Sequence, residues 1–325
     1  YYAIKSVEKG QRQRVMQEVA VLRTLSHENV LKFVAWYETQ NHLWVILEYC
    51  VGGDLLLLLR QDLKLPEPSI TTFARDMFVA VREIHSKGLI HCDLKPSNML
   101  LDEEGRIKVC GFGLSRKITA VATANGTPAQ LSRRGTPCYM APEMFTPEGV
   151  HSFATDLWAL GCVLYECAPG RPPFTSTSLT SLIEQILEHE PSPLPSSCSA
   201  SFKSLVFGLL IKRPHARLTW EQVIHHEFWT ERGGEYKDDV RQLSSLRLPP
   251  QAAFDALAAK LKSEDLAARL KMLGSVRDSG SAGAADLRKS FMPSLTQSLR
   301  DSVNVLRLSR IARSNLEREE AGTYG

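Results

Sequence analysis

The sequence predicts an α+β fold with two lobes, a small β-rich lobe at the N-terminus and a larger helical lobe after it. Strand-like patterns dominate up to residue 49, and from Gly52-Gly53 onward the apolar positions repeat mainly at helical spacing. With 325 residues and 43% hydrophobic content, the chain can also bury a sizeable core. Disorder throughout is therefore excluded.

The elements follow one another in a simple order. Residues 1–7 predict a strand that starts without an upstream turn, as if inside a sheet. Residues 12–25 carry apolar side chains at helical spacing, and residues 31–38 and 43–49 predict two further strands. Helices of the second lobe are expected near residues 54–61, 69–87, 155–168, 178–189, 199–210 and 220–226.

The amino-acid composition of the chain changes after the second predicted lobe. We interpret residues 1–230 as the folded domain and residues 231–250, which contain a Gly-Gly and a Pro-Pro pair, as a linker. Residues 251–325 predict a helical, partly disordered tail with amphipathic patterns at 252–273 and 295–320. The last pattern is basic, and a packing or partner helix explains it better than membrane binding.

Charge and cysteine content exclude several classes of protein. Residues 1–230 hold 23 Lys and Arg against 23 Asp and Glu, and the tail holds 16 against 13, too even a balance for a nucleic-acid-binding face. The seven cysteines are an odd number without a C-x-x-C pair, which suits a reduced intracellular protein better than a disulfide or zinc framework. Neither a secretory leader nor a run of 18 apolar residues is found, so no membrane role is expected.

One short segment predicts the chemistry. Residues 91–98 read His-Cys-Asp-Leu-Lys-Pro-Ser-Asn, which places Asp93, Lys95 and Asn98 in one loop stiffened by Pro96. Phosphoryl transfer needs a carboxylate that orients the attacking hydroxyl, a cation near the phosphate and an oxygen ligand for Mg²⁺. The three residues supply one of each, so the segment predicts phosphoryl transfer.

A lysine near the N-terminus fits the same chemistry. Lys5 follows the apolar pair Ala3-Ile4, and Glu18 lies on the next predicted helix, where it could pair with Lys5. Taken alone, Lys5 would be interpreted as a solvated lysine at a strand end. The segment at residues 91–98 favours phosphate binding instead.

These motifs together resemble the eukaryotic protein kinases over residues 1–230. The resemblance implies the two-lobed protein kinase fold, with ATP and Mg²⁺ as cofactors and a protein as substrate. The match begins in the third strand of the family's sheet, after its first two strands and glycine-rich loop. Lys95 together with Thr136 favours serine or threonine as the acceptor. The catalytic residues would be Asp93, Lys95 and Asn98, with Asn98 also a metal ligand.

The same resemblance assigns the remaining site residues. For the nucleotide they are the ion pair of Lys5 and Glu18, Ala3 and Leu100 around the adenine, Glu48 and Cys50 in the hinge, and Asp54 at the ribose. For the substrate segment and its supports they are Thr136 in a Gly-Thr-Pro run, Glu143 in Ala-Pro-Glu with Arg217 as its partner, and Asp156 as the brace of the catalytic loop.

Four further segments resemble the Unc-51-like/Fused group of these kinases, namely residues 36–39, 41–44, 151–158 and 170–174. Members of that group carry a long helical-repeat region after the kinase domain and are tied to microtubules, the phragmoplast or cilia. The resemblance therefore implies a protein substrate or a cytoskeletal partner, and a location in the cytoplasm or on the cytoskeleton.

Two departures from the family pattern limit what the resemblance implies. Cys92 stands where many kinases have an arginine that receives an activation-loop phosphate. Gly111, in Cys110-Gly111-Phe112, stands where the family has the metal-binding aspartate of Asp-Phe-Gly, which makes Mg²⁺ binding doubtful. The neighbouring acidic residues 102–104 are expected on a turn that points away from the nucleotide. An error in the sequence is the alternative explanation of Gly111.

Two hypotheses of different class follow. In the first, the domain is a working serine/threonine kinase, which the retained Lys5, Glu18, Asp93 and Asn98 favour. In the second, it is a pseudokinase that binds nucleotide weakly and acts as a binding module, which the missing ligand at Gly111 favours. Cys110 would line the nucleotide pocket, although a small buried hydrophobe is the simpler explanation.

Overall fold

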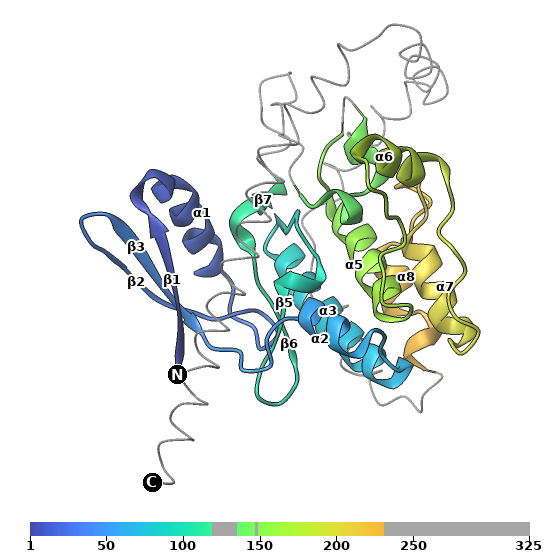
Figure 1. Cartoon of the computed structure of the whole chain (residues 1–325), viewed down its shortest axis with the longest axis horizontal. Coiled ribbons are helices and arrows are strands. Elements are labelled where there is room, and N and C mark those ends of the chain that lie inside the picture. The colour runs from blue at the N-terminus through green and yellow to red at the C-terminus, as the bar shows by residue number, and fades with distance from the viewer. Residues whose placement is uncertain (119–134, 147–148, 231–325) are drawn as a thin grey trace, which may run out of the picture. The chain divides into compact units, whose positions relative to one another are not determined.

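The computed structural model describes residues 1–118, 135–146 and 149–230. Its N-terminal lobe is a three-stranded antiparallel sheet in the order β1-β3-β2, with one helix, α1, beside it (Figure 1). These elements are β1 (Tyr2–Glu8), a 3-10 turn at Lys9–Gln11, α1 (Arg12–Leu22), β2 (Phe33–Glu38) and β3 (His42–Glu48).

Side-chain alternation explains why the central strand lies where it does. Along β3, Leu43, Val45 and Leu47 are buried while the residues between them are partly exposed. This is the period-2 pattern of a strand with one face on a core. In α1 the buried residues Val15 and Val19 lie one turn apart, so this helix also presents one apolar face.

The C-terminal lobe is built from helices, several of which begin at a capping side chain. Asp54 accepts a hydrogen bond from the main-chain N of Leu57, and Ser178 and Ser199 cap two later helices in the same way. The helices are α2 (Leu55–Asp62), α3 (Glu67–Ser86), α5 (Phe153–Cys167), α6 (Leu179–Glu188), α7 (Ala200–Leu209) and α8 (Trp220–Ile224). Helix α5 packs against both α3 and α7 and is buried along nearly its whole length.

Short strands and 3-10 turns carry the loops of the site between the helices. Two pairs of strands form small antiparallel ribbons, β4 (Leu89–Ile90) with β7 (Arg116–Lys117) and β5 (Met99–Leu101) with β6 (Ile107–Val109). The 3-10 turns of this lobe are Pro96–Asn98, Phe112–Leu114, Pro137–Tyr139, Pro142–Phe145 and Glu227–Trp229.

The predicted two-lobed α+β class is confirmed, and each helix and strand expected within residues 1–230 has a counterpart shifted by at most a few residues. The predicted linker at 231–250 and the tail at 251–325 lie outside the described residues and stay predictions. Within the described part of the chain, no helix is both long enough and apolar enough to cross a membrane.

A buried ion pair joins distant parts of the C-terminal lobe. Arg217, which is 1% exposed, donates from Nη1 to Glu143 Oε1 at 2.8 Å and from Nη2 to Glu143 Oε2 at 2.9 Å. It also donates to the carbonyl oxygens of Ala154 and Ile211. The planar guanidinium thus ties the Ala-Pro-Glu turn to α5 and to the chain that precedes α8.

We predict that Arg217→Lys lowers the free energy of unfolding by about 3 kcal/mol, because a lysine cannot reproduce the two-pronged contact and leaves Glu143 poorly paired. Urea unfolding followed by circular dichroism measures the change. Arg213→Lys, on an exposed residue four positions earlier, is the control and should change stability by no more than about 0.5 kcal/mol. Equal effects of both substitutions would contradict the prediction.

Candidate functional site

A buried carboxylate fixes the start of the loop at residues 91–98. Asp156 of α5 accepts hydrogen bonds from the main-chain N of His91 at 2.7 Å and from that of Cys92 at 3.0 Å. Burial opposes ionisation of Asp156, but its hydrogen bonds, above all the one from His85, hold its pKa below the ordinary value. Asp156, the predicted brace of the catalytic loop, therefore contacts the main chain at the start of that loop.

Two residues that the sequence analysis did not single out complete this brace. Trp220 Nε1 lies 2.9 Å from His85 Nδ1, and an indole N–H can only donate. His85 therefore carries its proton on Nε2, from which it donates to Asp156 Oδ2 at 2.8 Å. Burial lowers the pKa of His85, which keeps the ring neutral. The only sequence signal of this role is the position of His85 on the apolar face of a long helix.

The acceptor side of the site is a closed triangle of polar groups. Lys95 Nζ lies 3.0 Å from Asp93 Oδ2 and donates to Thr136 Oγ1 at 2.9 Å, while Thr136 donates to Asp93 Oδ1 at 2.9 Å. Both charged side chains are about nine-tenths buried. The triangle shows that the Asp93 carboxylate can hold a hydroxyl group next to the ammonium group of Lys95, which is the arrangement that phosphoryl transfer to a serine or threonine requires.

The metal side of the site differs from the acceptor side. Gly111 has φ +85°, in the left-handed region, and offers no side-chain ligand. A Cβ atom at Gly111 would lie 2.5 Å from Cγ and 2.6 Å from Nδ2 and Oδ1 of Asn98. The Asn98 amide nitrogen donates to the Asp93 carbonyl at 2.7 Å and to Asp93 Oδ2 at 3.2 Å. The predicted metal ligand Asn98 thus fills the space beside Gly111 and is hydrogen-bonded to Asp93.

On the nucleotide side, Lys5 Nζ of β1 lies 2.9 Å from Glu18 Oε2 of α1, so the predicted ion pair is formed. Burial raises the pKa of the Cys110 thiol, and Cys50 and Glu18 are close enough to raise it further. Cys110 is half-buried and lies near residues predicted to bind nucleotide, and its raised pKa lowers the reactivity of its thiol.

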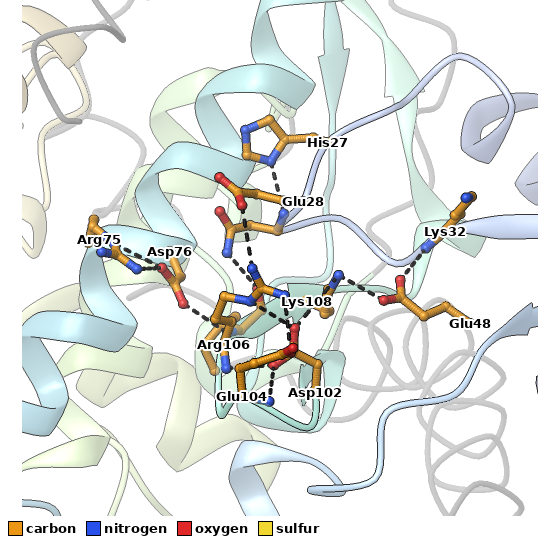
Figure 2. Close-up of polar contacts among 12 residues, drawn as sticks. His27, Glu28, Lys32, Glu48, Arg75, Asp76, Asp102, Glu104, Arg106 and Lys108 are labelled. Atoms are coloured by element: carbon orange, nitrogen blue, oxygen red, sulfur yellow. Dashed lines mark hydrogen bonds and ion pairs between the residues drawn. The ribbon is translucent and has the colours of Figure 1, made fainter. Parts of the chain in front are cut away.

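The carboxylate of Glu48, in the hinge strand, points toward Lys32 and Lys108 (Figure 2). It accepts from the main-chain N of Lys32 at 3.0 Å and pairs with Lys108 Nζ at 2.7 Å. Any contact of Glu48 with adenine would therefore come from its main chain. Asp54 caps α2, and its main chain bridges to that of Leu100. The contacts predicted for Ala3, Cys50, Asp54 and Leu100 with a nucleotide stay predictions.

The acidic turn after β5 is occupied by cations. Asp102 Oδ2 lies 3.0 Å from Arg106 Nε, and Glu104 Oε2 lies 3.0 Å from Arg106 Nη2, as Figure 2 shows. Asp102 also accepts from the main-chain N of Arg106 at 2.9 Å. The carboxylates of Asp102 and Glu104 are thus paired with Arg106 of the same turn. They do not replace the metal ligand missing at Gly111.

Cys92 has an apolar environment. It lies in a buried cluster with Ile90, Ile118 and Phe153, against which Leu114 packs. Its backbone has φ +68°, and burial raises the pKa of its thiol well above the ordinary value. This position therefore anchors the loop by hydrophobic contact, and offers no positive charge to a phosphate.

Comparison with known proteins agrees with this site. Residues 1–229 match the model of the protein kinase domain, which covers more than two thirds of the chain. The chain belongs to the protein kinase family, and its relatives define a serine/threonine protein kinase domain.

The motifs in the sequence point to RUNKEL as a near relative within the Unc-51-like/Fused group, and this assignment is confirmed. The chain is 42% identical to the serine/threonine-protein kinase RUNKEL of Arabidopsis thaliana, across 98% of this chain and 25% of that protein. It is 34% identical to serine/threonine-protein kinase ULK4 of Mus musculus, across 71% of this chain and 20% of that protein. The chain therefore spans a quarter or less of the length of these relatives.

We predict that Cys110 reacts slowly with iodoacetamide at pH 7.5, because its pKa lies far above that pH, and more slowly still when ATP is bound. Mass spectrometry of the peptide that contains Cys110 measures the rate. Cys198, which lies near Glu67 and away from the site, is the control whose rate should not respond to ATP. Equal rates for Cys110 with and without ATP would contradict its placement beside the nucleotide.

We also predict that phosphorylation at Thr127, Ser132 or Thr136 does not activate the domain through position 92, because Cys92 is packed among apolar side chains. Thr127 and Ser132 lie outside the described residues. Phosphotransfer is measured before and after phosphatase treatment, for the natural chain and for Cys92→Ala. A large activity in the phosphorylated form that phosphatase removes, and that Cys92→Ala abolishes, would overturn this prediction.

Proposed function

We propose that this kinase domain is a pseudokinase, a module that binds adenine nucleotide with little help from Mg²⁺ and acts mainly by binding other proteins. The formed ion pair of Lys5 and Glu18 supports nucleotide binding, because it holds an ammonium group where phosphates are expected. Phosphotransfer would then be slow relative to that of a domain with both metal ligands.

The arrangement of Gly111 and Asn98 carries the proposal. A hard cation such as Mg²⁺ needs several oxygen ligands at short distance, usually including a carboxylate. Gly111 supplies none, and the amide of Asn98 is neutral and donates to Asp93. The Asp93 carboxylate itself faces Lys95 and Thr136. The residues present therefore do not fit a Mg²⁺ ion held in the usual way of the family.

A second candidate, a working serine/threonine kinase, rests on a different observation. The triangle of Asp93, Lys95 and Thr136 is complete, and such a group has no evident use in a module that only binds. In this alternative Asp93 orients the substrate hydroxyl and takes its proton, and Lys5 and Lys95 neutralise the phosphate charge.

One experiment separates the two candidates. Nucleotide binding is measured by calorimetry with and without Mg²⁺, and phosphotransfer to a generic protein substrate is compared for the natural chain, Gly111→Asp and Gly111→Ala. We expect the affinity of the natural chain to change less than about twofold with Mg²⁺, and Gly111→Asp to transfer phosphate about 100-fold faster than the natural chain. The new aspartate would displace the Asn98 amide and so free both groups to act as metal ligands.

Gly111→Ala is the matched control, since its Cβ displaces Asn98 equally but brings no carboxylate. It should give no gain in rate. If the natural chain transfers phosphate as fast as Gly111→Asp, the pseudokinase proposal fails. If Lys5→Met leaves nucleotide affinity unchanged, the proposed nucleotide site fails as well.

For the role of the whole protein, we infer a cytoskeletal partner in the cytoplasm. The support is the similarity to the Unc-51-like/Fused group, and the chain covers only part of its relatives' length. Co-sedimentation of the full-length protein with polymerised tubulin tests this inference, with unpolymerised tubulin as the control. Equal recovery of the protein in both pellets would count against it.

A further inference from the structure

The hinge, residues 48–54, joins β3 of the N-terminal lobe to α2 of the C-terminal lobe. Near its end, Gly52 N donates to the Leu101 carbonyl oxygen at 2.9 Å, and Leu101 N donates to the Gly53 carbonyl oxygen at 2.9 Å. A Cβ atom at Gly52 would lie 2.6 Å from Leu101 Cβ, so a side chain at this position would not fit without a shift of β5. The main chain thus fixes this end of the hinge on the ribbon of β5 and β6.

The start of the hinge is held on the same ribbon by a side chain. Lys108 of β6 lies opposite Leu100 of β5 in the register of the two strands, so both side chains leave the ribbon on one face. Lys108 Nζ lies 2.7 Å from Glu48 Oε1, and Glu48 Oε2 accepts from the main-chain N of Lys32 at 3.0 Å, as Figure 2 shows. Both carboxylate oxygens of Glu48 therefore have a partner, and one of the two partners comes from the other lobe.

The ion pair of Glu48 and Lys108 is largely removed from water. The side chain of Lys108 is 9% exposed and that of Glu48 is 25% exposed. Solvent and salt therefore screen this pair less than an exposed pair, and the loss of one partner leaves the other charge poorly paired. Asp102 Oδ2 lies 3.8 Å from Lys108 Nζ but only 3.0 Å from Arg106 Nε. Glu48 is thus the nearer partner of Lys108.

The same charges reach the middle of the hinge. Burial raises the pKa of the Cys50 thiol to about 12, and the carboxylates of Glu48 and Asp102 raise it while Lys108 lowers it. Lys108 therefore lies close to the hinge residue whose main chain is expected to bind adenine, although its ammonium group is engaged by Glu48.

We propose that Lys108 is a positioning residue for the nucleotide, which acts through Glu48 to fix the main chain of the hinge where adenine binds. This inference rests on the proposed nucleotide site. A segment held at both ends presents its N–H and C=O groups in one arrangement, so little order remains to be created when the ligand binds. Without Lys108 the hinge is fixed by the ribbon only at Gly52 and Gly53, and ordering of its start then opposes binding.

Calorimetry with ATP on the full chain tests this role. We expect Lys108→Met to weaken binding about fivefold, and Lys108→Arg, which keeps a positive charge beside Glu48, to stay within about twofold of the natural chain. In a chain that already carries Glu48→Gln, Lys108→Met should weaken binding by less than about twofold, because the partner through which it acts is gone. Lys87→Met, which breaks the ion pair of Lys87 with Glu83 on α3, is the matched control and should leave the affinity unchanged.

Hydrogen exchange of the chain without nucleotide gives a second, independent measurement. The main-chain N–H of Glu48 donates to the Lys32 carbonyl oxygen at 2.9 Å, so its exchange rate reports how firmly the start of the hinge is held. We expect this N–H to exchange at least about fivefold faster in Lys108→Met, with no change along α5. Melting curves show that each variant is folded.

The outcomes separate this role from the proposed function. If Lys108→Met binds ATP as tightly as the natural chain, the role of Lys108 fails while the nucleotide site stands. A loss that Lys108→Arg does not restore, or that persists in full beside Glu48→Gln, shows that Lys108 does not act through Glu48 and also overturns the proposal. Faster exchange along α5 would indicate general loosening of the fold and would count against it. If the natural chain binds no ATP, the nucleotide site itself fails, and the role of Lys108 fails with it.

Discussion

The buried carboxylate of Asp156 is the constraint on which the catalytic loop depends. It accepts two main-chain hydrogen bonds from the start of the loop and a third from the neutral ring of His85. A charge removed from water is tolerated only when it is satisfied in this way. Because Trp220 fixes which nitrogen of His85 carries the proton, the position of the loop is set by groups on three different helices.

The acceptor side and the metal side of the site are stabilised in different ways. The acceptor side is assembled from charged groups that compensate one another within a few ångströms, and it needs nothing further to be stable. The metal side has lost its negative charge at Gly111, and the Asn98 amide has taken up the space. A carboxylate without a cation would be repelled by Asp93 nearby, whereas a neutral amide is compatible with it. The pair of Gly111 and Asn98 is thus internally consistent without a metal.

Much of the fold could be predicted because it follows from local patterns. The period-2 pattern of β3 and the serines that cap α6 and α7 are local features of the sequence. The acidic turn at residues 102–104 predicts a strand on each side of it, and β5 and β6 are these strands. The shorter β4 and β7 are not predicted, since two residues carry too little periodicity to be recognised. Within the site, spacing identified Asp93 and Lys95, because their roles are local to one loop.

The direction of individual side chains could not be predicted in the same way. Glu48 belongs to the predicted hinge, but its carboxylate turns toward Lys108, a residue sixty positions away in the chain. Similarly, nothing near His85 in the sequence indicates Trp220 as its partner. Tertiary contacts determine these side-chain directions, and a single sequence does not show which tertiary contacts form.

The apolar cluster around Cys92 has a consequence for the energetics of the loop. A loop held by an arginine and a phosphate depends on two exposed charges, and dissolved salt screens their attraction. A loop held by Ile90, Ile118 and Phe153 depends on the exclusion of water, which strengthens with warming near room temperature and is little affected by moderate salt. This packing is present in the unmodified chain, so the start of the loop is held by hydrophobic contact and not by an added phosphate.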